Sequence, residues 1–182
     1  MSLKIISKQD MAPFVSSVMS QYDVLGPVAK ETKFAFAPLT DAAQLRLDYN
    51  TTILPPKKAL LPQEEMLFTF KTNGSLSAQP VFDIRPRVIF GAHTCDIHAM
   101  KLLDAVFAKG YPDAHYLKRR ENTLIVGIEC LTPCDEHSFC KSMGTLSASE
   151  GYDIHLTDLG DAAALCAGPG LSAGECVHRK AH

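Results

Sequence analysis

The sequence predicts an α/β fold, a parallel or mixed sheet with a central βαβ unit and a smaller N-terminal α+β portion. Two short apolar runs, 88–92 and 124–128, have the pattern of strands buried on both faces of a parallel sheet. Between them, 96–109 carries apolar residues at helical spacing, and Gly110 follows where a helix C-cap belongs. Parallel strands need a crossover of this kind, so the three segments together predict the βαβ unit.

Three details of this unit also follow from the residue pattern. The helix is expected to bury a single face, made of Ala99, Leu102, Leu103, Val106 and Phe107. The polar segment 118–122 is interpreted as part of a loop that leads into the second strand. Residues 152–156 alternate apolar and polar side chains, which predicts a strand at an edge of the sheet.

The N-terminal portion is predicted to contain a helix and two short strands. Residues 7–22 place apolar side chains at intervals of three and four, as in an amphipathic helix. Asp10 is the expected cap, which leaves Pro13 in the first turn. The strands are expected at 24–28 and 34–38, with a turn between them.

A proline-containing segment follows at 48–70. Pro55, Pro56 and Pro62 exclude a regular helix or a central strand. We interpret this segment as an extended strap on the surface, suited to docking a partner or covering a site, or as a solvated face. A turn is expected directly after it, at 72–75.

Length and composition predict one globular domain. A chain of 182 residues, 46% of them hydrophobic, can bury a substantial core. The domain is expected to span 1–161. The Ala-, Gly- and Ser-rich segment 162–182 is expected to be a poorly ordered tail.

Charge and hydropathy exclude several classes of function. A formal net charge of −2 gives no basic excess for binding nucleic acid. No apolar run approaches the ~20 residues of a membrane span, and the polar N-terminus lacks the apolar region of a signal peptide. The chain is therefore expected to be cytoplasmic.

Four of the six cysteines predict a metal or redox site, because a cytoplasmic chain keeps its thiols reduced. Cys95 and Cys130 lie just beyond the two buried strands, so parallel pairing brings both to one sheet edge, on strands ~4.8 Å apart. Cys134 and Cys140 follow in a polar loop. Four thiolates suit a four-iron four-sulfur cluster or a structural zinc, and the spacing matches neither usual pattern.

Other residues near this edge are assigned lesser roles. His93, His98 and His137 are expected to be neighbours of the site or surface residues rather than ligands. Cys95 begins a helix, where the dipole favours a thiolate. Cys95 and Cys130 could equally be small buried hydrophobic residues. The last two cysteines, in the expected tail, are interpreted as incidental: Cys166 and Cys176.

A series of short segments carries a resemblance to a known family. The segments are 47–49, 55–58, 61–64, 91–99, 119–122, 139–145 and 152–161. In this order they resemble the N-terminal domain of the family that contains sulfhydrogenase beta subunits and the A subunits of anaerobic sulfite reductases. The resemblance implies an iron–sulfur subunit that passes electrons between a flavin-containing subunit and a hydrogenase or reductase subunit.

The chain departs from this family in two ways. Where the family has a cysteine two residues before Cys140, this chain has Ser138, and Cys134 is the expected substitute. The family also continues into a ferredoxin domain with two four-iron four-sulfur clusters, and this sequence ends without one. A ferredoxin on a separate chain is therefore a further expected partner.

The leading hypothesis is an electron-transfer accessory subunit that performs no bond chemistry itself. Its single four-iron four-sulfur cluster would be held by the four clustered cysteines, Cys95, Cys130, Cys134 and Cys140. A second hypothesis is a structural or partner-docking domain with a four-cysteine zinc site or no metal. A third is a thiol-based enzyme that uses Cys95, although the sequence offers no evident base to activate it.

Overall fold

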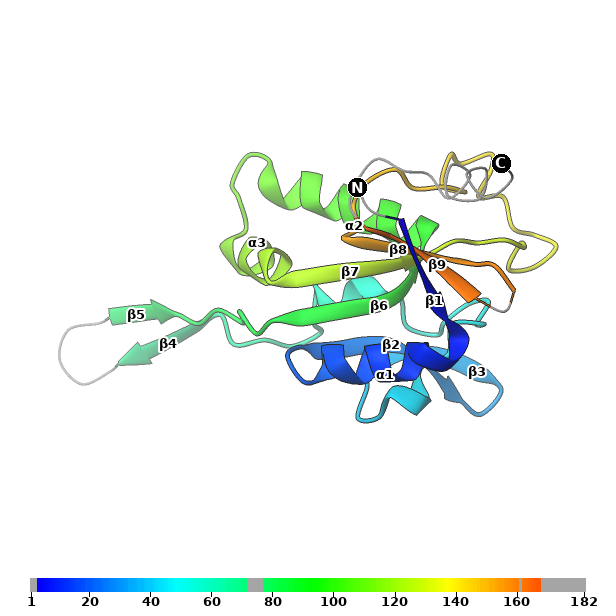
Figure 1. Ribbon diagram of the computed structural model, residues 1–182. Coiled ribbons are helices and arrows are strands. Elements are labelled where there is room, and N and C mark those ends of the chain that lie inside the picture. The colour runs from blue at the N-terminus through cyan, green and yellow to red at the C-terminus, as the bar shows by residue number, and fades with distance from the viewer. Residues whose placement is uncertain (1–2, 72–76, 161, 168–182) are drawn as a thin grey trace.

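The computed structural model of the chain describes residues 3–71, 77–160 and 162–167. Its centre is a mixed seven-stranded sheet in the order β1-β9-β8-β7-β6-β2-β3. Helix α1 lies on one face of the sheet, and α2 and α3 lie on the other (Figure 1). The predicted α/β class is therefore confirmed. The elements are β1 (Leu3–Ser7), α1 (Lys8–Met19), β2 (Asp23–Lys30), β3 (Lys33–Pro38), η1 (Ala42–Gln44), η2 (Pro56–Ala59), β4 (Phe68–Lys71), β5 (Ser77–Pro80), β6 (Arg87–His93), α2 (Thr94–Ala108), α3 (Ala114–Glu121), β7 (Thr123–Ile128), β8 (Ile154–Asp158) and β9 (Ala162–Ala167).

The central βαβ unit is confirmed. Strands β6 and β7 pair in parallel, with Ile89 opposite Ile125. The crossover contains a second helix, α3, so the interpretation of 118–122 as a loop was wrong for all but its last residue. Asp113 caps this helix by accepting hydrogen bonds from two backbone N–H groups. Its buried face carries Tyr116 and an arginine, which an apolar pattern does not reveal.

The buried face of α2 differs from the predicted one. Ile97 and Met100 are fully buried, whereas Leu102 and Val106 are exposed by 69% and 66%. Of the predicted face, only Leu103 and Phe107 pack against the core. The helix carries two apolar stripes, so periodicity alone could not determine which of them faces the sheet.

The N-terminal helix and the hairpin form as predicted. The two strands of the hairpin, however, belong to the main sheet. Strands β2 and β3 are antiparallel, and β2 pairs in parallel with β6. The cap of α1 is Ser7, whose hydroxyl accepts a hydrogen bond from the backbone N–H of Asp10. Asp10 is therefore not the cap, and Pro13 lies inside the helix rather than in its first turn.

The predicted edge strand is an interior strand. β8 pairs in parallel with β7 and antiparallel with β9, which in turn pairs with β1. Strand β9 also differs from the expectation of a poorly ordered tail from residue 162 onward. Residues 168–182, which include Cys176, lie outside the described residues, as does the turn expected at 72–75.

The proline-containing strap is partly core. Leu60 is fully buried and packs with residues of α2, β6 and β7. The buried guanidinium of Arg119 donates a 2.8 Å hydrogen bond to the carbonyl of Leu60 and pairs with Glu65. Beyond this anchor the antiparallel pair β4–β5 extends away from the sheet (Figure 1). The strap therefore closes one face of the sheet, and the hairpin leaves it.

Strand β6 contains a bulge just before the cysteine-bearing helix. Its register against β7 shifts between Phe90 and Ala92, at Gly91, whose φ is +86°. A Cβ there would lie 2.9 Å from Leu47 and 3.3 Å from Pro27. Bulges of this kind re-aim the residues that follow them, here the start of α2.

We expect Gly91→Ala to lower the free energy of unfolding by about 1–3 kcal/mol, from left-handed backbone strain and crowding against Leu47 and Pro27. The matched control is Gly160→Ala, because Gly160 has a φ of +89° but no neighbour within 4 Å of the added Cβ. The control should show the backbone strain alone. Urea unfolding of both variants tests this, and equal losses would contradict the role assigned to the bulge.

Candidate functional site

The four clustered cysteines line one pocket at the carboxyl edge of the sheet. Cys95 is in the first turn of α2, directly after β6, and Cys130 follows β7 by two residues. Together with Cys134 and Cys140 they border a pocket of about 310 Å³. Much of the remaining wall is apolar, with Leu131, Pro133 and Leu146 among its lining residues.

The loop that carries three of these cysteines is fixed to α2 at its far end. Thr94 donates a 3.1 Å hydrogen bond to the carbonyl of Leu146, and its hydroxyl also lies 4.0 Å from the sulfur of Cys130. One and two turns further along α2, His98 bonds to the carbonyl of Ser147 and Lys101 pairs with Glu150. These helix positions, four and three residues apart, share one face.

The segment that α2 holds is followed by a glycine, and close packing against the helix explains why a glycine is needed there. Gly151 has a φ of +88°, and a Cβ there would lie 2.8 Å from the Lys101 side chain and 3.1 Å from Ile97. A side chain at this position would therefore push the loop away from α2. The close approach of Gly151 to the helix helps to hold the cysteine loop over the edge.

A stacked aromatic pair lies beside the pocket. The ring centroids of Tyr49 and His93 lie 4.1 Å apart, and the two rings are nearly parallel. The Tyr49 hydroxyl donates a 2.7 Å hydrogen bond to the carbonyl of Gly91, in the β6 bulge. Both rings are buried. The strap thus reaches the start of α2 through Tyr49, and His93 has a packing role, in agreement with its predicted place beside the site.

Burial dominates the electrostatics of the pocket. It raises the pKa of the Cys95 thiol to about 12, with smaller contributions from Asp96 and the other three thiols. Burial also raises the pKa of Cys130 and of Cys134. The pKa of the Cys95 thiol therefore lies above its usual value, opposite in direction to the shift expected at a helix N-terminus.

The pocket gathers the thiols without forming the ligand set of a single ion. Within the described ranges, no three His, Cys, Asp or Glu side chains are grouped closely enough to hold a metal ion. Ser138, where the sequence resemblance predicts a cysteine, is bound within the loop itself: its hydroxyl donates to the carboxylate of Asp135 and accepts from the Asp135 N–H. Four thiols therefore remain as the donor set of the pocket.

In the described part of the chain, none of the other residues with predicted lesser roles is among the residues that line the pocket. His137 is exposed and lies 3.5 Å from Glu136, whereas His98 forms a hydrogen bond with the carbonyl of Ser147 in the loop. Cys166 lies in β9, opposite Leu3 and next to β8 in the sheet.

Sequence reasoning missed two contributors to this edge, Thr94 and the buried pair Glu129–His155. The sequence carried a signal for both, because Thr94 and Glu129 each directly precede a cysteine that follows a strand. The Glu129 carboxylate lies 3.7 Å from Nε2 of His155, whose side chain is 2% exposed. Burial raises the pKa of Glu129 and lowers that of His155 to about 4, so each side chain is held toward its neutral form.

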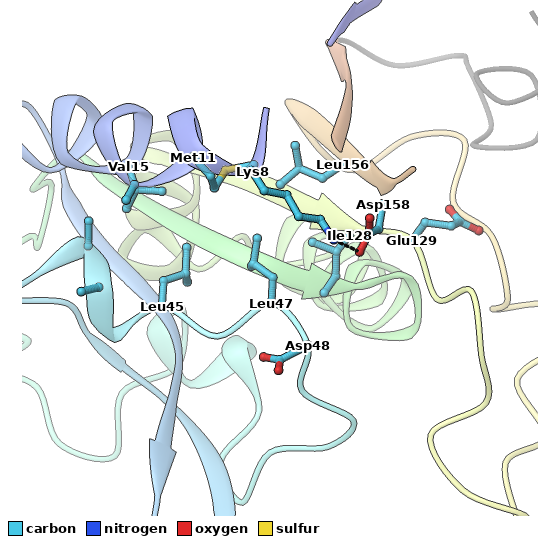
Figure 2. Close-up of a pocket in the computed structure, with 13 residues that line it drawn as sticks. Lys8, Met11, Val15, Leu45, Leu47, Asp48, Ile128, Glu129, Leu156 and Asp158 are labelled. Carbon is cyan, nitrogen blue, oxygen red and sulfur yellow. Dashed lines mark hydrogen bonds and ion pairs between the residues drawn. The ribbon is translucent and has the colours of Figure 1, made fainter. Parts of the chain in front are cut away.

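A second pocket, of about 420 Å³, opens at the same edge on the α1 face (Figure 2). Its walls are mainly apolar, with Met11, Leu47 and Leu156 pointing into it. Lys8 spans it to reach Asp158 in a 2.9 Å ion pair. That cation is already paired, and the other charged groups of the lining are the carboxylates of Asp48 and Glu129, so this pocket indicates no particular ligand.

The chain as a whole is similar in sequence to a known protein. The chain is 41% identical over 138 residues to sulfhydrogenase 2 subunit beta of Pyrococcus furiosus. The chain is a relative of a sulfhydrogenase beta subunit. The match covers 76% of this chain and 40% of the relative, so it spans well under half of the relative's length.

This match supports the resemblance to sulfhydrogenase beta subunits predicted from the segment pattern. The likeness to the anaerobic sulfite reductases stays a prediction. No protein-family model matches the chain, and no solved structure does. None of the helices in the described part of the chain has the length and hydrophobicity needed to cross a membrane.

The buried imidazole of His155 predicts an acid-sensitive fold. The unfolded chain takes up a proton at this histidine below pH ~6.5, whereas the folded chain resists protonation until about pH 4. Stability should therefore fall as the pH drops through this window, by up to about 3 kcal/mol. The raised pKa of Glu129 acts in the opposite direction, so the contribution of His155 must be isolated by substitution.

We expect His155→Gln to flatten the pH dependence of the unfolding free energy between pH 6.5 and 4. The exposed His137→Gln is the control and should leave the profile unchanged. Urea unfolding at several pH values provides the measurement. A His155→Gln profile as steep as that of the unsubstituted protein would show that another group causes the acid sensitivity.

Proposed function

We propose that this chain is an electron-transfer accessory subunit of a hydrogenase or a sulfur or sulfite reductase complex. It would bind one four-iron four-sulfur cluster through Cys95, Cys130, Cys134 and Cys140. The observation that carries the proposal is the single pocket that all four thiols line, at the carboxyl edge of parallel strands. Iron–sulfur clusters are held by sets of cysteine thiolates of this size.

The arrangement of donors favours a cluster over a zinc ion. With a Zn–S bond of ~2.3 Å, a four-thiolate zinc site needs sulfurs about 3.8 Å apart. The four thiols line a pocket of about 310 Å³, which is far more space than a single ion occupies. A cluster fills such a space because several metal atoms separate the ligand sulfurs.

The raised thiol pKa values also weigh against a thiol-based enzyme. A nucleophilic cysteine needs a depressed pKa or a nearby base, whereas burial raises the pKa of Cys95 to about 12. A metal centre imposes no such requirement on the free thiol, because metal binding displaces the protons.

The chain's own residues would then position and insulate the cluster. Leu131, Pro133 and Leu146 limit water access, which together with hydrogen bonding tunes the redox potential of such centres. Thr94 supplies a hydroxyl 4.0 Å from the sulfur of Cys130. The cluster supplies one-electron redox chemistry, and nothing in this assignment requires the chain to make or break bonds.

The partners are proposed from the family. Its relative is named as the beta subunit of a sulfhydrogenase, and therefore as one subunit among others. We propose a flavin-containing subunit and a hydrogenase or reductase subunit as partners for this chain. A ferredoxin on a separate chain is proposed as a third.

The test is the iron, sulfide and zinc content of the protein after anaerobic purification. We expect iron and sulfide in a four-to-four ratio per chain and no stoichiometric zinc. Cys95→Ser should lose most of the iron and sulfide while keeping the fold, because the sheet has an apolar core on each face. Metal analysis and thermal unfolding of the same samples measure both effects.

Cys166→Ser is the control for this experiment, since Cys166 lies in β9 and is not a proposed ligand. Its metal content should equal that of the unsubstituted chain. Unchanged iron in Cys95→Ser would overturn the ligand assignment. Stoichiometric zinc without sulfide, together with global unfolding of Cys95→Ser, would instead identify a structural zinc domain.

A further inference from the structure

We propose that the surface around the cysteine pocket docks a separate redox protein with an apolar contact patch and a rim of lysine or arginine residues. This inference rests on the proposed function, because it assigns the place where the electron leaves or enters. We call this surface the cysteine-loop face. It consists of Leu131, Phe139, Met143 and Leu146.

The apolar side chains of this face point to solvent beside the thiols. Phe139 and Met143 are 66% and 65% exposed, Leu131 is 60% exposed and Leu146 is 44% exposed. Leu131 and Leu146 also line the cysteine pocket, and Phe139 directly precedes Cys140. Several exposed apolar side chains gathered at one site mark an interaction surface, unlike scattered single ones.

Backbone hydrogen bonds hold the part of the loop that carries these side chains. The N–H of Met143 donates to the carbonyl of Phe139, and the N–H of Thr145 donates to the carbonyl of Cys140. With Thr94 holding Leu146 at the end of the loop, the chain is tied on both sides of Cys140. The face is therefore preorganised, which lowers the entropic cost of binding a partner.

The charge of the face selects the chemistry of the partner. Within the loop 131–146, Asp135 and Glu136 are exposed next to Cys134, against one exposed lysine, Lys141. A loaded site adds further negative charge, because four thiolates outweigh the positive charge of the iron–sulfur core. A partner with a basic rim is attracted to such a face, and an acidic one is repelled.

The function of the site requires contact at this place. Electron transfer weakens steeply with distance, so a partner's cofactor must approach the thiols closely. Helix α2 contributes Thr94 and Cys95 to the pocket lining, and the loop contributes the rest, including the exposed side chains of Leu131 and Leu146. Encounters between electron-transfer proteins bury small areas, and a short apolar patch with a charged rim suits them.

The β4–β5 hairpin provides a matched control surface. Phe70 is 66% exposed and Met66 is 63% exposed, nearly the values of Phe139 and Met143. Phe70 lies in β4 and Met66 lies just before it, and the β4–β5 hairpin precedes β6. The cysteines instead follow the carboxyl ends of β6 and β7. The same substitutions can therefore be made at equal exposure far from the pocket.

The experiment uses anaerobically purified protein and mitochondrial cytochrome c, a basic haem protein, as the probe. Calorimetry of the two oxidised proteins at low salt gives a Kd without electron transfer. After reduction by dithionite and desalting, stopped-flow mixing follows one electron from the iron–sulfur centre reducing ferric haem to ferrous. Ferricyanide, a small oxidant that needs no docking face, serves as the comparison acceptor.

We expect Phe139→Ser/Met143→Ser to raise the Kd and lower the cytochrome c rate by about tenfold or more, with iron content and the ferricyanide rate unchanged. Phe70→Ser/Met66→Ser should change none of these. Added salt should weaken binding of the unsubstituted protein. Glu136→Lys should weaken binding as well.

Normal iron and sulfide with an unchanged Kd and cytochrome c rate in Phe139→Ser/Met143→Ser would overturn this inference alone. Equal losses in the hairpin control would do the same. A dimer that Phe139→Ser/Met143→Ser dissociates, detected by light scattering, would assign the face to a second copy of the chain instead. Absence of iron and sulfide from the unsubstituted protein would overturn the proposed function, and this inference with it.

Discussion

The parallel pairing of β6 with β7 brings the carboxyl ends of two buried strands to one edge of the sheet, and the candidate site is built outward from there. Cys95 and Cys130 lie together because their strands end together. The Gly91 bulge re-aims the last residues of β6 into α2. A change that separated these two strands would disperse the thiols even if every cysteine were retained.

The cysteine loop depends on a second set of contacts, all from one face of α2. Thr94, His98 and Lys101 hold the segment 146–150. The loop therefore needs no regular structure of its own to bring Cys134 and Cys140 over the edge. Irregular backbone allows several side chains to converge, and the helix supplies the rigidity that the loop lacks. The same rigidity keeps the apolar side chains of the cysteine-loop face exposed.

Two buried arginines connect elements at the end of the sheet opposite the cysteine pocket. Arg119, 1% exposed, joins α3 to the strap through Leu60 and Glu65, and Arg87 joins β6 to Asp83. Nε of each arginine lacks a hydrogen-bond partner in the described structure. Buried ion pairs contribute little net stability, but removing one partner is costly. This cluster fixes the path of the strap, and through Tyr49 the strap reaches the site edge.

The sequence by itself determined what depends on short-range pattern. Apolar runs of a few residues predicted β6 and β7, helical spacing predicted α1 and α2, and the positions of Cys95 and Cys130 after strands predicted a shared edge. Each of these follows from the local geometry of strands and helices, in which neighbouring residues alone set the pattern. The segment resemblance pointed to sulfhydrogenase beta subunits, and the similarity to one of them supports it.

Only the tertiary structure decided what depends on distant partners. Leu102 and Val106 resemble core residues in sequence, yet the sheet takes the other stripe of α2. β8 is interior because β9 and β1 pair beyond it. α3 was hidden because its buried face includes a charged residue whose partners lie 54 and 59 positions away. The loop that carries Cys134 and Cys140 is likewise held at its far end by long-range bonds from α2, since a loop's path is set by what it packs against.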